Sequence, residues 1–220
     1  MKNILALILF LSIAFADENG VLIKAVNALD RFMAIPEERI PPKLLAKAAA
    51  VAIIPNLVRG GFIIGARYGR GVLLVRNGKS WSDPLFIRMY GGSLGWQIGL
   101  EAIDVVLVFA DRKSALELLN GKVTLGADLS VAVGPVGRAG QAATDITFKA
   151  KIYSYSRSMG AFAGIALAGA VLELDYDANM RFYGCDPSKA YLIIQGRCHK
   201  RNEFVKILKR KLKEYSTWHE

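Results

Sequence analysis

The amino-acid sequence predicts an α+β fold in which a curved or closed antiparallel β-sheet of about eight or nine strands is covered by helices from both ends of the chain. Apolar residues make up 53% of the 220 residues and charged residues 22%, so a sizeable core can form and intrinsic disorder is excluded. Short β-branched or aromatic runs alternate with glycine through the middle of the chain, whereas helical periodicity marks its two ends. This length fits one domain, which we place at residues 17–196.

Residues 1–16 have the pattern of a signal peptide. Lys2 gives a basic start, an apolar run follows from residue 4 to residue 15, and Ala14-Phe15-Ala16 is a small-x-small cleavage sequence. The apolar run is too short to span a bilayer, although an uncleaved anchor or a buried strand is an alternative. We therefore expect cleavage after Ala16, a mature chain that begins at Asp17, and a bacterial periplasmic location.

Two helices are expected at the start of the mature chain. Residues 21–33 place apolar side chains at i, i+3 and i+4 spacing, which predicts an amphipathic helix that Pro36 stops. Pro41-Pro42 then opens a second helix, because proline is tolerated in the first helical turn, and this helix runs toward Pro55.

The predicted sheet extends from about residue 51 to residue 184. One helix interrupts it, with Asp111 as its N-cap and Asn120-Gly121 at its end. The uncharged run from residue 160 to residue 172 is too short for a transmembrane helix, and its glycines favour buried strands in close contact. The runs that predict strands are 51–54, 61–69, 71–76, 85–92, 93–99, 103–110, 129–133, 146–156 and 162–174.

Gly78-Lys79-Ser80 resembles the end of a phosphate-binding loop, but the glycine that this motif requires five positions earlier is Leu73. Asn77-Gly78 lies between two strand-like runs and is a strong signal for a two-residue hairpin turn. We therefore expect a hairpin at this position.

The chain ends in helices. Asp186-Pro187 is an N-cap followed by proline, and Gly196 closes that helix. Residues 200–215 form a final amphipathic helix, within a basic C-terminal segment that we place at 197–220. Its apolar stripe consists of Phe204, Leu208, Leu212 and Tyr215.

Cys185 and Cys198 are the two cysteines of the chain. An oxidising compartment would allow them to form a disulfide, and two unrelated thiols are the alternative. A loop of this size would add roughly 3 kcal/mol to stability by the chain-entropy estimate.

Patterns that carry catalysis or bind metals are mostly absent from the sequence. The two histidines, His199 and His219, lie in the basic tail, and Gly-x-Ser-x-Gly does not occur. We expect neither an enzyme nor a metal or cofactor site. Glu173, Asp175 and Asp177 could form a loose cation site, but residues 180 and 186 are not the glycine and glutamate of a calcium loop, and a solvated strand end is the alternative.

The formal net charge of +10 favours anionic partners, and two basic surfaces are candidates for them. Strand 146–157 alternates between an apolar face and a basic, aromatic face, whose alternative interpretation is the wet side of an antiparallel sheet. The basic segment 197–213 is typical of a membrane-surface helix, or else of a helix docked on the sheet. Nucleic acid is excluded as a partner by the export signal. The predicted phospholipid-binding residues are Lys149, Lys151, Tyr153, Tyr155 and Arg157 on the strand, and Lys206, Lys209, Arg210, Lys211 and Lys213 on the helix.

The order of short motifs along the chain resembles the SYLF domain family, a lipid-binding module related to yeast actin-binding proteins. The resemblance extends from about residue 21 to residue 196, and one departure is Ala168, where many relatives have a glutamate before glycine. The matching pieces are Ala52-Ile53-Ile54-Pro55-Asn56, Gly61-Phe62-x-x-Gly65, Tyr68-Gly69-x-Gly71-Val72, Trp81-Ser82-x-Pro84, Gln97-Ile98-Gly99, Asp104-Val105-Val106, Leu125-Gly126-Ala127-Asp128, Gly134-Pro135-Val136-Gly137-Arg138, Tyr155-Ser156-Arg157-Ser158-x-Gly160, Phe162-Ala163-Gly164, and Asn179 with Tyr183-Gly184.

This resemblance implies a non-enzymatic domain that binds phospholipids, which are phosphoinositides in eukaryotic members, some of which also bind actin filaments. It also implicates an N-terminal amphipathic helix in some relatives. For an exported bacterial member, what carries over is phospholipid binding by a basic surface. A protein-interaction scaffold of the cell envelope is the alternative function.

Overall fold

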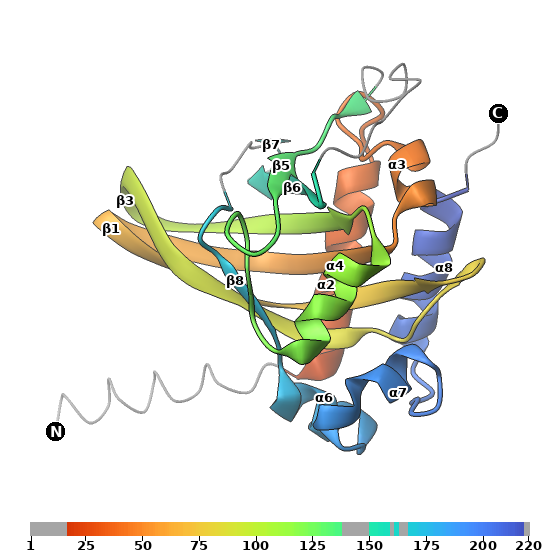
Figure 1. The fold of residues 1–220 in the computed structure, drawn as a ribbon. Helices are drawn as coiled ribbons and strands as arrows, with labels where there is room; N and C mark the ends of the chain where they lie inside the picture. Colours follow the sequence, from red (N-terminus) through yellow and green to blue (C-terminus); the bar gives the residue numbers. More distant parts are fainter. Residues whose placement is uncertain (1–16, 138–149, 159–160, 163–166, 218–220) are drawn as a thin grey trace, which may run out of the picture.

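The computed structural model of the chain describes residues 17–137, 150–158, 161–162 and 167–217. The predicted α+β class is confirmed, because the described residues form a curled eight-stranded sheet with helices from both ends of the chain packed on it (Figure 1). The sheet is mixed, since β5 (Val131–Val133) pairs in parallel with β6 (Ile152–Ser158). The predicted signal peptide lies outside the described residues.

Two long strands dominate the sheet. β1 (Ala50–Asn77) and β3 (Leu85–Phe109) pair antiparallel along most of their length. Both strands bend back at the same level, so that the two-stranded ribbon has two legs that meet at a projecting tip (Figure 1). Register shifts between Ile54 and Leu57 and between Gly61 and Ile63 mark bulges, which increase the bend and twist of a ribbon.

The sequence predicted three separate strands in each of these regions, and this division was wrong. Glycines that read as strand ends lie inside continuous strands, because the two legs of the ribbon approach each other closely. A Cβ atom on Gly69 would lie 2.9 Å from side-chain carbons of Ile54 and Leu57, and one on Gly71 would overlap the backbone of Ile53. These glycines therefore permit contact between the legs rather than ending a strand.

The remaining strands complete the sheet around this ribbon. β2 (Ser80–Trp81) pairs with the end of β1 through the predicted hairpin, in which Gly78 has a φ of 59°. β6 pairs with the second half of β3 and with β7 (Ala161–Phe162). β8 (Val171–Leu174) pairs with the first half of β3 and with β4 (Val123–Thr124). Of the run predicted as buried strands, residues 167–170 instead lead into β8 through a turn.

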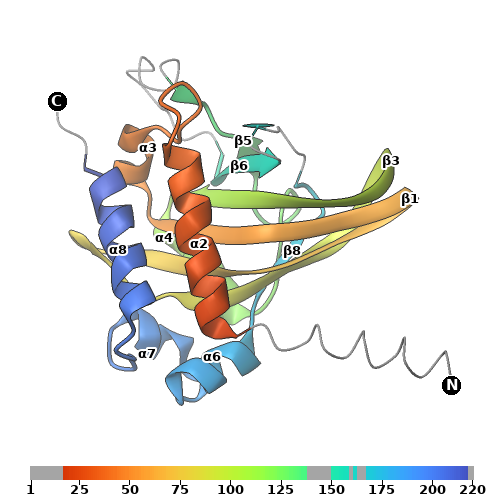
Figure 2. The same ribbon diagram turned by 180° about the vertical axis from the view of Figure 1, so that it is seen from behind.

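Helices from the two ends of the chain lie side by side on the sheet (Figure 2). α2 (Glu18–Met33) is capped by Asp17, whose side chain accepts from the Asn19 N–H, and its apolar stripe is buried against β1. α8 (Glu203–Tyr215) begins at the N-cap Asn202 and packs against α2, β2 and the short α3 (Pro42–Lys47). α3 ends well before Pro55, because β1 already begins at Ala50.

Short helices fill the other connections. α4 (Arg112–Glu117) and η2 (Leu118–Asn120) form the predicted interruption, and Asp111 accepts a hydrogen bond from the Ser114 N–H at 2.8 Å. α6 (Tyr176–Tyr183), η3 (Pro187–Lys189) and α7 (Ala190–Ile194) precede α8. The predicted Cys185–Cys198 disulfide is present, with the two Cα atoms 6.5 Å apart, and it ties the end of α6 to the segment after α7.

Candidate functional site

The predicted basic and aromatic face of β6 is not exposed, and this part of the prediction was wrong. Tyr153 and Tyr155 are buried, and Arg157 is only 6% exposed. Alternation correctly places these side chains on one side of the strand, but the segment after β5 covers that side. The Tyr155 hydroxyl donates to the Pro135 carbonyl at 3.0 Å, and the ring packs so closely on Gly134 that no side chain would fit there.

Arg157 has a structural partner on each side of its guanidinium group. It donates to the carbonyl oxygen of Arg31, in the last turn of α2, and it forms an ion pair with Glu38 at 2.8 Å. Burial raises the pKa of Tyr155 far above its usual value, so the phenol stays neutral. Of the predicted cations on this strand, Lys151 is half exposed with its Nζ 3.9 Å from Asp111, and Lys149 lies outside the described residues.

The cations of α8 divide into two groups. Lys209 and Lys211 are half-buried and fix the helix in place, through ion pairs with Asp83 at 2.6 Å and with Asp30 at 2.9 Å. Lys206, Arg210 and Lys213 face solvent. Lys206 pairs with Glu203 at 3.5 Å, but both side chains are about two-thirds exposed, and such pairs contribute little to stability.

The apolar face of α8 belongs to the core. Leu208 and Leu212 are fully buried, and Val205 is nearly so. The Tyr215 hydroxyl donates to Asp30 at 2.8 Å; burial and this hydrogen bond raise the pKa of Tyr215 to about 12. The alternative of a docked helix is therefore confirmed, and the stripe is not available to a membrane while α8 stays docked. No helix in the described part of the chain is long and apolar enough to cross a bilayer.

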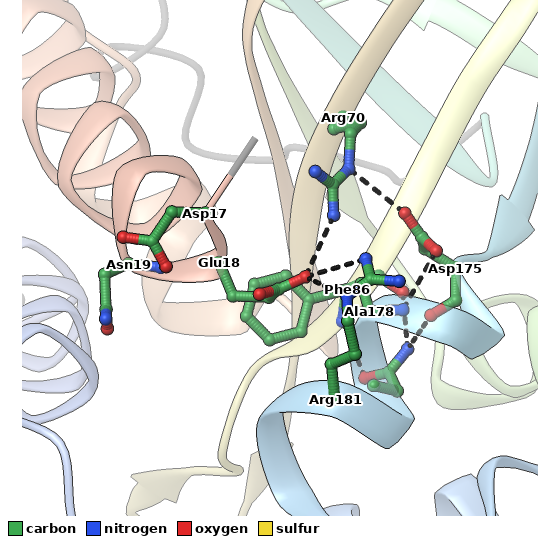
Figure 3. Close-up of polar contacts among 9 residues, drawn as sticks. Asp17, Glu18, Asn19, Arg70, Phe86, Asp175, Ala178 and Arg181 are labelled. Carbon is green, nitrogen blue, oxygen red and sulfur yellow. Dashed lines mark hydrogen bonds and ion pairs between the residues drawn. The ribbon is translucent and has the colours of Figure 1, made fainter. Parts of the chain in front are cut away.

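Asp175, at the acidic end of β8, and the nearby Glu18 form ion pairs with arginine side chains (Figure 3). Asp175 accepts a hydrogen bond from the Ala178 N–H as the N-cap of α6, and its other carboxylate oxygen lies 3.1 Å from Arg70 Nε. Glu18, the first residue of α2, receives Arg70 at 3.4 Å and Arg181 at 2.9 Å. These contacts join the start of α2 to β1 and α6.

The other two carboxylates of the predicted loose cation site are those of Glu173, which already has partners, and Asp177, which is exposed. Glu173 forms an ion pair with Arg88 at 3.1 Å and accepts from the Tyr90 hydroxyl at 3.0 Å, while Asp177 is exposed in the first turn of α6. Within the described ranges, no group of three or more His, Cys, Asp or Glu side chains is arranged to hold a metal ion. Asp175, Glu18 and Glu173 therefore join elements of the fold through ion pairs with arginines.

A polar cluster at the bend of the ribbon was missed by the sequence analysis. Arg59 and Glu101 face each other across the β1–β3 pair and form an ion pair at 2.7 Å. The Ser158 hydroxyl donates to Glu101, and this bond lowers the pKa of Glu101 against the opposing effect of burial. Arg67 donates to the Gly92 carbonyl at 2.9 Å, and burial together with the nearby charge of Arg59 lowers its pKa.

The same part of the ribbon also carries exposed apolar side chains. Leu100 is 85% exposed, Tyr68 51% and Val58 45%, and all three belong to the ribbon near its tip. The sequence signal was available, because residues 60–66 and 91–100 contain no charged side chain. These residues were assigned only to strands of the sheet, since the sequence alone does not show that the ribbon projects from the body.

Comparison with known proteins identifies the family. The profile of the Ysc84 family, described as Las17-binding protein actin regulator, matches residues 90–215. The SH3 domain-containing YSC84-like protein 1 of Xenopus laevis is 36% identical over 187 residues, which cover 82% of this chain and 56% of the relative. Its human counterpart is 36% identical over 181 residues, covering 79% of this chain and 52% of the relative.

A yeast protein extends the same similarity. LAS seventeen-binding protein 3 of Saccharomyces cerevisiae is 34% identical over 165 residues, which cover 73% of this chain and 36% of the relative. The chain thus spans about half the length of the vertebrate relatives and 36% of the length of the yeast relative. The family profile covers more than half of the chain, and the motif order read from the sequence agrees with it. The chain therefore belongs to the Ysc84 family, the family of SYLF domains.

Proposed function

We propose that this chain is a non-enzymatic protein that binds anionic phospholipid at a membrane surface, as an exported periplasmic protein of the bacterial envelope. The solvent side of α8 carries this proposal. Its apolar face is committed to the core, yet Lys206, Arg210 and Lys213 remain exposed on a helix whose other cations are already paired. A docked helix needs no such charges for its own packing.

The physical strength of this contact can be estimated. A basic residue near an anionic membrane surface contributes about 1 kcal/mol, so three such residues give a weak, reversible attraction. These charges are exposed and are screened over about 8 Å at physiological ionic strength, so binding through them should weaken as salt rises. The segment before α8 carries the further exposed cations Arg197, Lys200 and Arg201.

Vesicle sedimentation tests the proposal. The variant Lys206→Glu/Arg210→Glu/Lys213→Glu should bind anionic vesicles more weakly than the wild type at low salt, while the wild type binds anionic vesicles more tightly than neutral ones. The matched control, Lys113→Glu/Lys122→Glu/Lys189→Glu, makes the same change in net charge at exposed positions on other elements and should retain binding. Equal loss in both variants would attribute binding to net charge alone and contradict a role for α8.

Export has its own test. Intact-mass analysis of the protein from its native host should give the mass of a chain that begins at Asp17. A full-length mass, or recovery from the cytosol, would contradict the proposed location.

A protein partner is the second candidate function, because the names of the family and of the yeast relative describe binding to the protein Las17. For this chain the corresponding proposal is an interaction scaffold of the cell envelope, whose acidic partner would contact the same basic surface. A wild type that binds no vesicles would favour it. So would a photo-crosslinker at Arg210 that captures one envelope protein, provided that reversing the charges at Lys206 and Lys213 abolishes the capture.

A further inference from the structure

The tip of the β1/β3 ribbon exposes apolar side chains to solvent on one face. We define the ribbon tip as residues 58–68 of β1 and 90–102 of β3. Gly60 lies opposite Leu100 and Val58 lies opposite Ala102, so Val58 and Leu100 share one face as diagonal neighbours. Because Gly60 has no side chain, the residue directly opposite Leu100 does not shield it, and Leu100 has the greatest exposure of the large apolar side chains in the described residues.

The ribbon tip stands apart from the rest of the molecule. Figures 1 and 2 show it projecting beyond the helices, at the end of the molecule opposite α8. Among the described residues, β3 pairs with β8 only up to Tyr90 and with β6 only from Ile103 onward, so between these positions it pairs with β1 alone. No described helix or further strand therefore covers this end.

The charges of the ribbon tip are confined to its base. Residues 60–66 and 91–100 are uncharged, and Arg59, Arg67 and Glu101 are the charged residues of the tip. Glu101 is bonded to Arg59 and to the Ser158 hydroxyl, so its negative charge is compensated. Arg67 is largely buried and donates to the Gly92 carbonyl, so the two arginines and one glutamate give the base of the tip a formal net charge of +1.

This order of groups matches the layers of a bilayer interface. Apolar side chains suit the acyl-chain boundary, a tyrosine such as the half-exposed Tyr68 suits the headgroup level, and the formal net positive charge at the base of the tip suits an anionic surface. A bilayer surface has no fixed shape that the tip must match, so a tip with many glycines and few large side chains can still bind it. The open edges of a two-stranded ribbon carry unpaired backbone groups that cannot enter hydrocarbon, so insertion must be shallow.

We propose that the ribbon tip inserts Leu100 and Val58 into the interfacial layer of a phospholipid bilayer, as the apolar membrane contact of this chain. The proposal rests on the proposed membrane function but uses a different surface. Because the ribbon tip and α8 lie at opposite ends, one flat bilayer cannot contact both, and variants at the two ends should act independently. The α8 contact is the salt-sensitive part of binding, and the ribbon contact is the salt-resistant part.

A single labelled cysteine reports insertion directly. The described residues contain no free cysteine, so Leu100→Cys can be labelled with a polarity-sensitive fluorophore, with Tyr191→Cys on α7 as the matched exposed control. With vesicles of phosphatidylglycerol and phosphatidylcholine, the label at position 100 should shift to the blue and be quenched by lipids brominated near the top of the acyl chains. The label at position 191 should show neither effect.

Sedimentation at high salt measures the contribution of the tip. In about 1 M salt, where charges are screened within about 3 Å, the variant Val58→Ser/Leu100→Ser should bind the same vesicles roughly tenfold or more weakly than the wild type. The matched control Met180→Ser/Tyr191→Ser, which alters exposed apolar residues of α6 and α7, should bind normally. Circular dichroism should show that all variants fold.

Each other outcome overturns the proposal in a distinguishable way. Vesicle binding without a spectral change at position 100 removes the ribbon contact and leaves the proposed function intact. A wild type that binds no vesicles at any salt removes both. A wild-type dimer that Val58→Ser/Leu100→Ser converts to a monomer in sedimentation velocity, with no vesicle insertion, would assign the tip to a second copy of the chain.

Discussion

At the scale of single residues, Asp104 and Asn56 show how this fold joins distant segments. Asn56 has a φ of 50°, a left-handed conformation that non-glycine residues rarely adopt, and it lies at the bulge of β1. Its N–H donates to Asp104 at 3.1 Å, and the second oxygen of Asp104 receives Arg31 of α2 at 2.5 Å. One buried carboxylate thus holds the bulge, β3 and α2 together.

The strained backbone of Asn56 leads to a stability prediction. Asn56→Ala should lower the free energy of unfolding by about 1–2 kcal/mol, because a Cβ without a compensating local hydrogen bond is unfavourable in the left-handed region. Asn56→Gly is the matched control and should change it by only a few tenths, since glycine adopts this conformation freely. Urea denaturation measures both, and equal losses would show that the side chain, not the backbone, matters.

The depressed pKa of Glu101 predicts a specific pH dependence. The Ser158 hydroxyl lowers this pKa, burial opposes the effect, and Arg59 lowers it further. A carboxyl with a folded pKa below its unfolded value of about 4.3 stabilises the fold above that value, and the contribution disappears as pH falls through the folded pKa. Glu101→Gln should therefore reduce the acid-side slope of unfolding free energy between about pH 5 and pH 2. Identical slopes in both proteins would contradict this account.

Single residues also mark the limit of sequence reasoning at this scale. The alternation along β6 correctly groups Tyr153, Tyr155 and Arg157 on one side, but a pattern within one strand carries no information about what covers that side. The cover comes from residues 134–135 and from the loop after α2, which lie about twenty or more than a hundred positions away. The division of the α8 cations depends in the same way on Asp83 and Asp30.

At the scale of elements, α8 offers a clean contrast between its two faces. Leu208→Ala should destabilise the protein by about 2–5 kcal/mol, because a fully buried leucine leaves a cavity. Arg210→Ala, on the solvent side of the same helix, should stay within about 0.5 kcal/mol of the wild type. Thermal or urea unfolding checks both, and a small effect at Leu208 would show that α8 is only loosely docked.

The disulfide acts on the elements around α7. Replacing both Cys185 and Cys198 by serine should cost about 2–4 kcal/mol, because the closed loop restricts the unfolded chain. The comparison is the wild type unfolded under reducing conditions, which should match the double variant under either condition. If the wild type is equally stable with and without reductant, the bond adds nothing.

Elements with a strong local signal were predicted well, and elements defined by distant contacts were not. The apolar stripe of residues 21–33, the Asp111 cap and the Asn77-Gly78 turn all depend on neighbours in sequence, and the structure has them at the expected positions. Gly69 and Gly71 broke the predicted strands because their meaning lies in the other leg of the ribbon. The order of motifs identified the family correctly, but it did not show that the uncharged residues of the ribbon tip project from the body of the molecule.

At the scale of the whole molecule, the helices and the ribbon tip occupy opposite ends of one sheet (Figure 2). α2 belongs firmly to the helical end. Its seven buried apolar residues lie in the core, Glu18 and Arg31 are fixed by ion pairs at its two ends, and Asp30 joins it to α8. Each large apolar side chain stabilises the fold by about 1.5–3 kcal/mol on burial, so undocking the helix would cost about as much as the 5–15 kcal/mol that typically stabilises a domain.

This arrangement predicts that membrane binding leaves α2 in place. A mechanism in which α2 inserts its apolar face into the bilayer would have to remove that face from the core and so unfold the domain. Hydrogen exchange of the protein on anionic vesicles should therefore show unchanged protection for residues 21–32, and increased protection for the ribbon tip. The protein without vesicles provides the reference for both segments. Faster exchange in α2 on binding, with the ribbon tip unaffected, would instead make the undocked helix the membrane contact.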